Sequence, residues 1–496
     1  MIKIIPKPKK VAFDKDSKLV DFRGKITEVI DDELNLKREG YLLSINGEGI
    51  TIKAKTQQGI LYGYKTLEQI KEQFGMGLPY CEIEDEPSFD YRGFMFDCCR
   101  HFFSVEEIKR HLNIMSKLKL NVFHWHLTED QGWRIEIKKY PKLNKIGSAR
   151  KETRGDKRAH TGFYTKNEIR EVVEYAKKLN IDVMPEFNVP GHFSSAIASY
   201  PYLSCKGEEI EVKTTWGIFS DIACMGREST YRFIFDVLDE IIELFPYEYI
   251  HLGGDEAIKT DVIECRECIK MIKENNLNDT EELQAHFMSR IVDYLEIKGK
   301  KVINWNDGAT SQNTSPKITI QHWHASKESV NATLEADNKG CDIILSPFFE
   351  YYLDYPYGMT GLKKTYEYDL KLKKKQIKNL KGLEAPIWTE YVDSQEQLDY
   401  MVYPRLIAVA DVAWGGSEGK NYEDFELRLI QFSKILDKNN IKYAKITQVN
   451  PTFIDGKKQV VKFFLNAAKG NIIKQQRINN KAKKKIKKFN KSLQSN

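Results

Sequence analysis

Hydrophobic and polar residues alternate in the first part of the chain. The segment GYLLSINGEGITIKAKT, residues 40–56, alternates on both sides of Asn46-Gly47, a pair that favours the turn of a β-hairpin. The following segment, 57–74, instead places its apolar residues at helical spacing. Strands followed by a packed helix predict a small N-terminal α/β domain over residues 1–86, with EDEPSF (84–89) as the linker.

A different pattern begins after this segment. Short runs rich in β-branched and aromatic residues recur, and most are followed by a stretch with helical periodicity, such as 104–119, 166–180 and 229–245. Strands that alternate with helices predict an α/β fold with a closed (β/α)8 barrel of the triosephosphate-isomerase type over 87–445. The run from 305 to 317 is too short for a full helix, so one crossover should be atypical. The expected strands are 91–97, 120–126, 181–187, 248–252, 301–305, 317–323, 342–347 and 383–388.

Polar and aromatic residues follow the predicted strands. Active sites of such barrels are built at the carboxyl ends of the strands, so these side chains should converge on one mouth. Carboxylates suit glycosidic-bond chemistry, and flat rings suit the apolar faces of a sugar. The residues at these ends are Arg100, His101, Glu129, Asp130, His192, Asp255, Glu256, Trp305, Asp307, Trp323, Tyr352, Asp354, Trp388 and Glu390.

Composition places the chain among ordinary globular proteins. Of its 496 residues, 41% are hydrophobic and 30% are charged. No stretch of about 20 apolar residues predicts a membrane span. The N-terminal segment lacks the apolar run of a signal peptide, so a cytoplasmic location is expected. The eight cysteines are scattered, which favours free thiols in a reducing compartment.

The charge is concentrated at the C-terminal end. The formal net charge is +6, and residues 471–496 carry nine Lys or Arg and no acid, which leaves 6 minus 9, or −3, for the rest. The extension 446–496 therefore ends in a basic tail. This tail could bind nucleic acid or an anionic surface, or it could be a solvated, partly helical segment. The body of the chain does not have the charge of a nucleic-acid binder, and no nucleic-acid partner is expected.

Eight segments between Gly59 and Trp414 resemble glycoside hydrolase family 20, the β-N-acetylhexosaminidases. They occur in the order GILYGYKTL, YRGFMFDCCRHFF, KLNVFHWHLTEDQGWR, PEFNVPGH, IHLGGDE, QHWH, YYLDY and APIWTE. The resemblance implies an N-terminal α/β domain and a (β/α)8 barrel, in agreement with the strand pattern.

It also implies an exo-acting, retaining enzyme that removes terminal β-linked GlcNAc or GalNAc from an oligosaccharide or glycoconjugate, with no cofactor. Alternatives are a variant that releases a disaccharide or a modified hexosamine, and a catalytically inactive carbohydrate-binding barrel.

The resemblance assigns the chemistry to adjacent carboxyls. Glu256 would protonate the leaving oxygen and later activate water, and Asp255 would orient the substrate's 2-acetamido group, whose oxygen is the nucleophile in this family. Burial and the neighbouring Asp255 should raise the pKa of Glu256. Tyr352 would hydrogen-bond the acetamido oxygen, with Tyr351 as the alternative.

Further residues would bind or tune by the same resemblance. Trp305, Trp323 and Trp388 would enclose the sugar. A single tryptophan more often belongs to the core, but the positions of these three at strand ends favour the site. Arg100 and Glu390 would hold the 3- and 4-hydroxyls, and Glu129 would also bind the substrate. Asp354 would face the 4- or 6-hydroxyl and repel a 6-sulfate or 6-phosphate. His192 would tune Glu256, and Arg92 would form a structural ion pair.

Three positions depart from the family pattern. Glu129–Asp130 stands where two aspartates are usual, and Asn188 stands where an aspartate is usual. Both changes are expected to touch the network of His192 and so to affect the pH optimum. Asn306–Asp307 replaces an acidic pair, and the sequence assigns Asp307 no role.

Cys265 and Cys268 form a lone C-x-x-C pair. One pair cannot make a four-ligand zinc site without partners, and the sequence indicates none. A chance pair on a helix and a local structural feature are the remaining interpretations, and no metal is expected.

Overall fold

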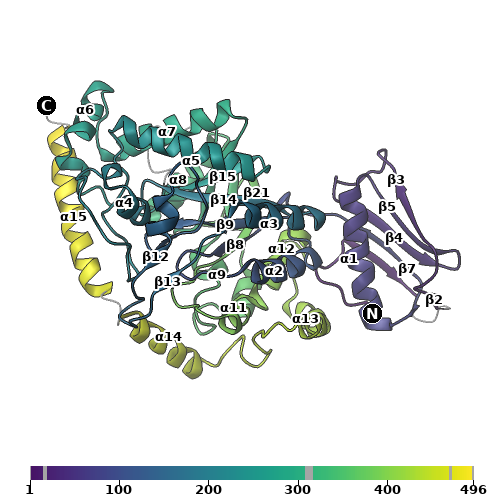
Figure 1. Ribbon diagram of the computed structural model, residues 1–496. Coiled ribbons are helices and arrows are strands. Elements are labelled where there is room, and N and C mark those ends of the chain that lie inside the picture. Colours follow the sequence, from purple (N-terminus) through teal and green to yellow (C-terminus); the bar gives the residue numbers. More distant parts are fainter. Residues whose placement is uncertain (1, 15–18, 308–316, 469–471, 494–496) are drawn as a thin grey trace.

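The computed structural model describes residues 2–14, 19–307, 317–468 and 472–493. Its N-terminal domain is a five-stranded sheet of order β1-β7-β4-β5-β3, and helix α1 packs on one face (Figure 1). The elements are β1 (Lys10–Phe13), β2 (Val20–Asp21), β3 (Ile26–Ile30), β4 (Tyr41–Asn46), β5 (Gly49–Ala54), α1 (Gln57–Phe74), β6 (Gly77–Leu78) and β7 (Cys81–Asp85).

The predicted hairpin is confirmed, with a small shift of its turn. Strands β4 and β5 pair antiparallel, and Asn46 lies opposite Gly49. The two loop residues are therefore Gly47 and Glu48, not Asn46 and Gly47. The Asn46 side chain accepts a hydrogen bond from the Glu48 N–H at 2.9 Å, so it shapes the turn from the last paired position.

The expected linker begins inside a strand. Glu84 and Asp85 belong to β7, and Asp85 is fully buried. One Asp85 oxygen lies 2.8 Å from the Nζ of Lys119, and the other accepts from the Trp414 indole at 2.9 Å. Because Lys119 and Trp414 belong to the barrel domain, this carboxylate joins the two domains.

The eight predicted strands form one closed parallel barrel, in sequence order, with the last strand paired to the first. Their ends differ from the prediction by at most three residues. All residues of the first, second and fourth strands are buried, as expected for strands covered by helices outside and filled within. The strands are β8 (Tyr91–Asp97), β9 (Val122–His126), β14 (Asp182–Val189), β15 (Tyr249–Gly253), β16 (Lys301–Trp305), β17 (Ile318–His322), β18 (Ile343–Leu345) and β21 (Leu380–Ile387).

The predicted helices begin at clear sequence signals. Helix α2 (Val105–Lys117) starts at a capping box in which Ser104 and Glu107 satisfy each other's backbone N–H groups. Helix α3 (Lys166–Lys178) starts at the same arrangement of Thr165 and Glu168. The other barrel helices are α4 (Ser194–Ser199), α5 (Glu228–Leu244), α6 (Arg266–Glu274), α7 (Thr280–Ile297), α8 (Lys327–Asn338), α9 (Phe348–Tyr351), α10 (Leu362–Glu367), α11 (Gln395–Val402), α12 (Arg405–Gly415) and α13 (Tyr422–Lys438).

Short elements occupy the loops around the barrel. They are β10 (Thr128–Glu129), β11 (Gly132–Trp133), β12 (Ala149–Arg150), β13 (His160–Thr161), β19 (Lys371–Leu372), β20 (Lys375–Gln376) and one-turn helices at Leu143–Gly147, Pro201–Leu203 and Val262–Glu264. The crossover expected to be atypical falls on 308–316, which lie outside the described residues.

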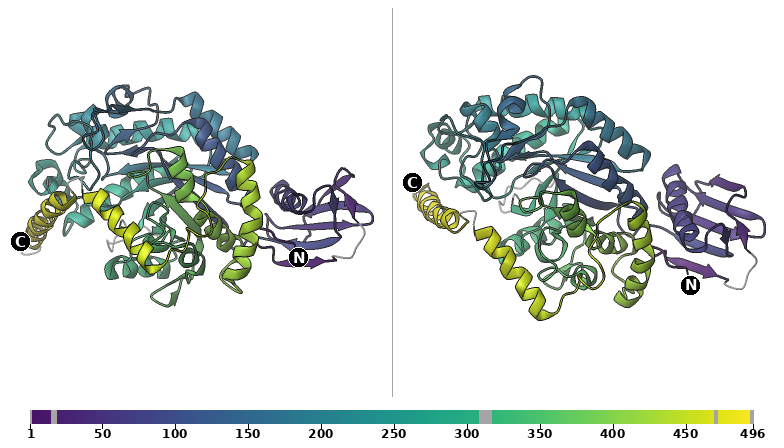
Figure 2. Two further views of the ribbon diagram at one scale, coloured as in Figure 1. Left: turned by 90° about the horizontal axis from the view of Figure 1, so that it is seen from below. Right: turned by 60° about the horizontal axis from the view of Figure 1, so that its bottom comes forward.

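The C-terminal extension contains two helices, α14 (Phe453–Ala468) and α15 (Ile472–Leu493), which run along the barrel (Figure 2). Gly456 of α14 packs against Gly358 so closely that a Cβ on Gly358 would lie 2.3 Å from the Gly456 oxygen. Lys485 of α15 forms an ion pair with Glu264. The basic tail is thus helical and in contact with the barrel. Over the described part of the chain, every helix is too short or too polar to cross a bilayer.

Candidate active site

A cavity of about 180 Å³ opens at the carboxyl ends of the barrel strands. Ten of the predicted residues line it, and they come from the ends of seven of the eight barrel strands. They are Arg100, His192, Asp255, Glu256, Trp305, Trp323, Tyr352, Asp354, Trp388 and Glu390. The convergence expected from the strand pattern is therefore observed.

The backbone after β15 is shaped by glycines. Gly253 and Gly254 have φ values of +67° and +89°, a region that favours glycine. A Cβ on Gly253 would also lie 2.1 Å from the Asn188 side chain. Glu256 itself has a φ of +52°, and its N–H donates to an Asp307 oxygen at 3.3 Å. A non-glycine residue in this region costs energy, so the surroundings hold Glu256 in place.

The two adjacent carboxyls have opposite pKa shifts. Burial, followed by the charges of Asp255 and Asp307, raises the pKa of Glu256 to about 8 against the opposing charge of His192. Burial also opposes ionisation of Asp255, but the charge and hydrogen bond of His192 outweigh it and lower the pKa of Asp255. At neutral pH, Glu256 therefore holds a proton and Asp255 is ionised.

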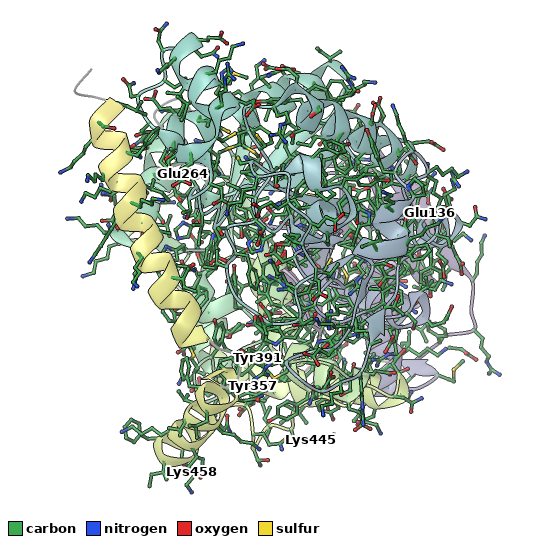
Figure 3. All side chains as sticks on the ribbon, turned by 60° about the vertical axis from the view of Figure 1, so that its left-hand side comes forward. Glu136, Glu264, Tyr357, Tyr391, Lys445 and Lys458 are labelled. Carbon is green, nitrogen blue, oxygen red and sulfur yellow. The ribbon has the colours of Figure 1, made fainter. Side chains whose placement is uncertain are left out.

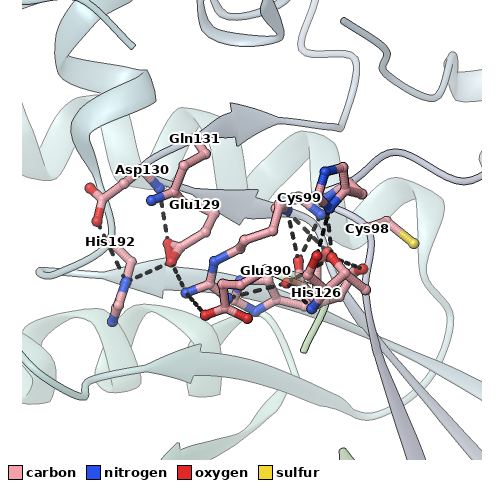
Figure 4. Close-up of polar contacts among 12 residues, drawn as sticks. Cys98, Cys99, His126, Glu129, Asp130, Gln131, His192 and Glu390 are labelled. Carbon is pink, nitrogen blue, oxygen red and sulfur yellow. Dashed lines mark hydrogen bonds and ion pairs between the residues drawn. The ribbon is translucent and has the colours of Figure 1, made fainter. Parts of the chain in front are cut away.

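His192 is the cation of this site. Its Nδ1 lies 2.7 Å from Glu129 and 3.6 Å from Asp130 (Figure 4). Its Nε2 lies 3.3 Å from Asp255 and 3.6 Å from Glu256. Burial opposes its charge, but Glu129 and Asp255 raise the pKa of His192 well above its usual range. Each side of the imidazole thus faces carboxylates, and the Glu129–Asp130 departure does lie in its network.

Glu129 does not line the cavity. It is fully buried, where it forms an ion pair with Arg100 as well as with His192. Its position suits holding these two residues rather than touching a sugar.

Asn188 contacts Asp255, which itself pairs with His192, so this departure touches the His192 network as expected. Its Nδ2 donates to Asp255 Oδ1 at 2.9 Å, and its Oδ1 accepts from the Gly254 N–H at 3.4 Å. The departure at Asn188 therefore acts directly on Asp255 and on the glycine turn.

Aromatic rings form the wall of the cavity. Trp305 and Trp388 have ring centroids 5.9 Å apart, and Trp323 stacks on Tyr352 at 6.1 Å with an interplanar angle of 23°. Tyr352 lines the cavity, whereas Tyr351 is fully buried against Tyr368. The placement favours Tyr352 over its alternative.

A charged group lies at another part of the wall. Arg100 is 3.3 Å from Asp97 and 3.8 Å from Glu390, and its guanidinium lies 4.9 Å from the centroid of Trp388.

Burial and the charge of Glu390 raise the pKa of Asp354 well above its usual range. Because a raised pKa favours the protonated form of Asp354, this side chain should repel an anionic 6-substituent less than the sequence analysis expected.

Several residues of the site lacked an assignment from sequence. Glu186, beneath the cavity, accepts from the Trp305 indole at 3.0 Å and from His126 at 2.5 Å. Phe463 of α14 lines the cavity, with ring contacts to Tyr355 at 5.4 Å and to Tyr391 at 5.3 Å. Figure 3 shows Tyr391 beside the yellow-green helix α14. Tyr391 directly follows Glu390 at a predicted strand end, and this position could have indicated its place in the site. Phe463 lies outside the barrel strands, and no sequence pattern indicated its place.

Two further expectations concern the ion pair of Arg92 and the partners of Cys265 and Cys268. Arg92 is fully buried and forms an ion pair with Glu39 at 2.9 Å, as predicted. The expectation that Cys265 and Cys268 have no partners is wrong, because Cys205 and Cys224 lie against them.

Comparisons with known proteins show the family of the chain. The family model described as glycosyl hydrolase family 20, catalytic domain, matches residues 89–417, and the one described as domain 2 of this family matches residues 17–86. A β-hexosaminidase of Porphyromonas gingivalis is 39% identical over 84% of this chain. The matched part spans 56% of the length of that relative. A β-hexosaminidase of Akkermansia muciniphila is 29% identical over 91% of this chain and 94% of its own.

Solved structures are similar throughout both domains. The β-N-acetylhexosaminidase of Bacteroides fragilis superposes with a TM-score of 0.80 at 29% identity, over 89% of this chain and 96% of its own. An exo β-N-acetylglucosaminidase of Vibrio harveyi in complex with N-acetylglucosamine has a TM-score of 0.79 at 29% identity. The match covers 90% of this chain and 78% of that protein's chain. This chain therefore belongs to glycoside hydrolase family 20.

Proposed function

We propose that the protein is an exo-acting, retaining β-N-acetylhexosaminidase that cleaves terminal β-linked GlcNAc or GalNAc by substrate-assisted catalysis. The observation that carries this proposal is the placement of two adjacent carboxyls on one small cavity, where the surroundings raise the pKa of Glu256 and lower the pKa of Asp255. A general acid needs its proton near neutral pH, and a group that orients an amide N–H needs its charge. Adjacent carboxyls with separated pKa values supply both.

In the first step, the acetamido oxygen attacks the anomeric carbon while Glu256 gives its proton to the departing glycosidic oxygen. The bond between carbon and that oxygen breaks, and an oxazolinium ring forms. Asp255 accepts a hydrogen bond from the acetamido N–H and offsets the positive charge of the ring. The Glu256 carboxylate then takes a proton from water, whose oxygen opens the ring at the anomeric carbon. Two displacements at one carbon retain its configuration.

The cavity wall supports recognition of a single terminal sugar. Its volume of about 180 Å³ lies below the range of roughly 300–1,000 Å³ for drug-sized ligands. Trp305, Trp323 and Trp388 would pack on the sugar and the acetamido methyl, and Tyr352 would donate to the acetamido oxygen. Arg100, Glu390 and Asp354 would bind the ring hydroxyls.

Hydrolysis of paired aryl glycosides tests the proposal. The wild-type protein should cleave the 2-acetamido sugar and not its 2-hydroxy analogue, and a thiazoline mimic of the cyclised intermediate should inhibit.

Asp255→Asn should lower kcat on the acetamido sugar, while Asp239→Asn, a change on the surface, should leave kcat unchanged. Equal cleavage of both sugars, or no thiazoline binding, would refute substrate assistance. Cleavage of disaccharide glycosides alone would refute the release of a monosaccharide.

A further inference from the structure

Four cysteines from two loops meet in one cluster outside the cavity. The ligand atoms of Cys205, Cys224, Cys265 and Cys268 all lie within 4.8 Å of one another. Three sulfur pairs are at contact: Cys205 and Cys268 at 3.8 Å, Cys224 and Cys265 at 3.7 Å, and Cys224 and Cys268 at 3.7 Å. All four are free thiols.

This geometry matches a tetrahedral metal site. Zinc binds thiolate sulfur at about 2.3 Å, and a tetrahedron of that radius has edges of about 3.8 Å. The observed contacts are too long for a disulfide, whose sulfurs are about 2.05 Å apart. Cys224 and Cys268 are fully buried, Cys265 is nearly so and Cys205 is partly buried. Four cysteine ligands leave no open position for a water ligand, as in structural rather than catalytic zinc centres.

The surrounding chain brings the sulfurs together. Gly226, two residues after Cys224, packs on the start of α6, where a Cβ would lie 2.4 Å from the Cys268 nitrogen. The Arg227 guanidinium donates to the Ser204 oxygen at 2.9 Å and to the Cys205 oxygen at 3.4 Å. Arg227 therefore fixes the chain at Cys205 and places positive charge beside a cluster that would carry two negative charges with zinc bound.

The start of α6 adds to this stabilisation. Cys265 is the N-cap of the nine-residue helix α6, and Cys268 lies in its first turn. The N-terminal end of a helix favours thiolates over thiols.

The cluster joins the two loops that carry the proposed catalytic residues. Cys205 and Cys224 belong to the segment between β14 and α5, which also carries His192, and Cys265 closes the segment after β15 that carries Asp255 and Glu256. Within the first loop, Cys224 donates its N–H to the Leu203 oxygen at 2.8 Å, and Ala223 donates to the Pro190 oxygen at 2.9 Å.

We propose that Cys205, Cys224, Cys265 and Cys268 hold one Zn²⁺ ion as a structural tetrathiolate centre that ties the loop after β14 to the loop after β15. Binding releases four protons, one from each thiol, and involves no change of oxidation state. This replaces the expectation of no metal, which rested on Cys265 and Cys268 alone. The proposal does not depend on the proposed glycosidase activity.

Metal analysis of the full chain, expressed with zinc and purified without chelators, tests the site. We expect about one zinc per chain in the wild type and a content lowered about tenfold or more in Cys268→Ser. Cys341→Ser removes another buried thiol and should keep about one zinc. Equal loss in both variants, iron in place of zinc, or disulfides among the four cysteines in unreduced peptide maps would overturn the proposal.

Two measurements on the wild type cover the case in which Cys268→Ser does not fold. X-ray absorption at the zinc edge should show four sulfurs at about 2.3 Å, and oxygen or nitrogen ligands would overturn the assignment. Removal of zinc by a chelator should speed amide hydrogen exchange in 200–227 and 254–268 together, with α1 unchanged. Unchanged exchange in both loops would refute the role as a tie between them.

Discussion

The Asn188 amide donates a hydrogen bond to Asp255 Oδ1 at 2.9 Å, and both side chains are buried. This contact joins the end of β14 to the end of β15. An amide at this position can donate without titrating, so it supports the ionised form of Asp255 across the whole working pH range.

Asn188→Ala should therefore raise the pKa of Asp255. A hydrogen bond to a charged group contributes about 1.5–3 kcal/mol, so we expect the acid limb of kcat/KM to move up by about one to two pH units. The pH profile on an aryl acetamido glycoside measures this. Asn113→Ala, which removes an amide on the outer helix α2, is the control and should leave the profile unchanged. An unshifted acid limb in Asn188→Ala would mean that this contact does not set the charge of Asp255.

Glu256→Gln should remove the proton donor. General acid catalysis contributes about 10²–10⁴-fold, so kcat should fall by that factor for substrates with poor leaving groups and by less for activated aryl glycosides. Circular dichroism and the melting temperature should match the wild type. Glu264→Gln, a change of the same kind in a surface ion pair, should keep full activity. A loss that is equal for good and poor leaving groups would contradict the role of acid.

The pH profile should report the charge of His192. With the pKa of Glu256 at about 8, kcat/KM should fall as the pH rises through that value, because the acid loses its proton. His192 lowers the pKa of both Asp255 and Glu256. In His192→Gln both values rise, so both limbs should move to higher pH together. A loss of activity without movement of either limb would indicate a purely structural role.

Phe463→Ala tests whether α14 takes part in the site. Aromatic contacts contribute about 0.5–1.5 kcal/mol beyond their buried area, so KM should rise about two- to tenfold with little change in kcat. Phe464→Ala removes the neighbouring ring, which is 53% exposed, and is the matched control. An unchanged KM in Phe463→Ala would separate α14 from substrate binding.

The buried pair of Asp85 and Lys119 should dominate the stability of the domain junction. Asp85→Ala leaves an unpaired buried cation, which costs about 3–5 kcal/mol in the free energy of unfolding. Glu84→Ala breaks the exposed pair with Lys10 at 2.7 Å and should cost about 1 kcal/mol or less. Urea unfolding of the two variants compares them. Equal midpoints would show that the buried pair does not stabilise the junction.

The sequence by itself determined the elements and the ends of the barrel strands. Apolar runs with helical stretches between them predict eight strands in order, and local signals such as Ser104 with Glu107 place helix starts. Because parallel strands end on one face, the residues that follow them had to converge, and ten of those predicted line the cavity. The Gly253-Gly254 pair before Asp255 was readable for the same reason, since it depends on local backbone geometry.

Only the tertiary structure decided which side chains touch. Periodicity carries no information about contacts between distant segments, so the sequence linked Asn188 to the network of His192 but did not identify its hydrogen bond to Asp255. Phe463 reaches the cavity from a helix beyond the barrel, and Cys205 and Cys224 reach Cys265 and Cys268 across two loops. The raised pKa of Glu256 was expected from burial and the adjacent Asp255, but the lowered pKa of Asp255 was decided by the tertiary structure, because its distance to His192 exists only once the barrel has closed.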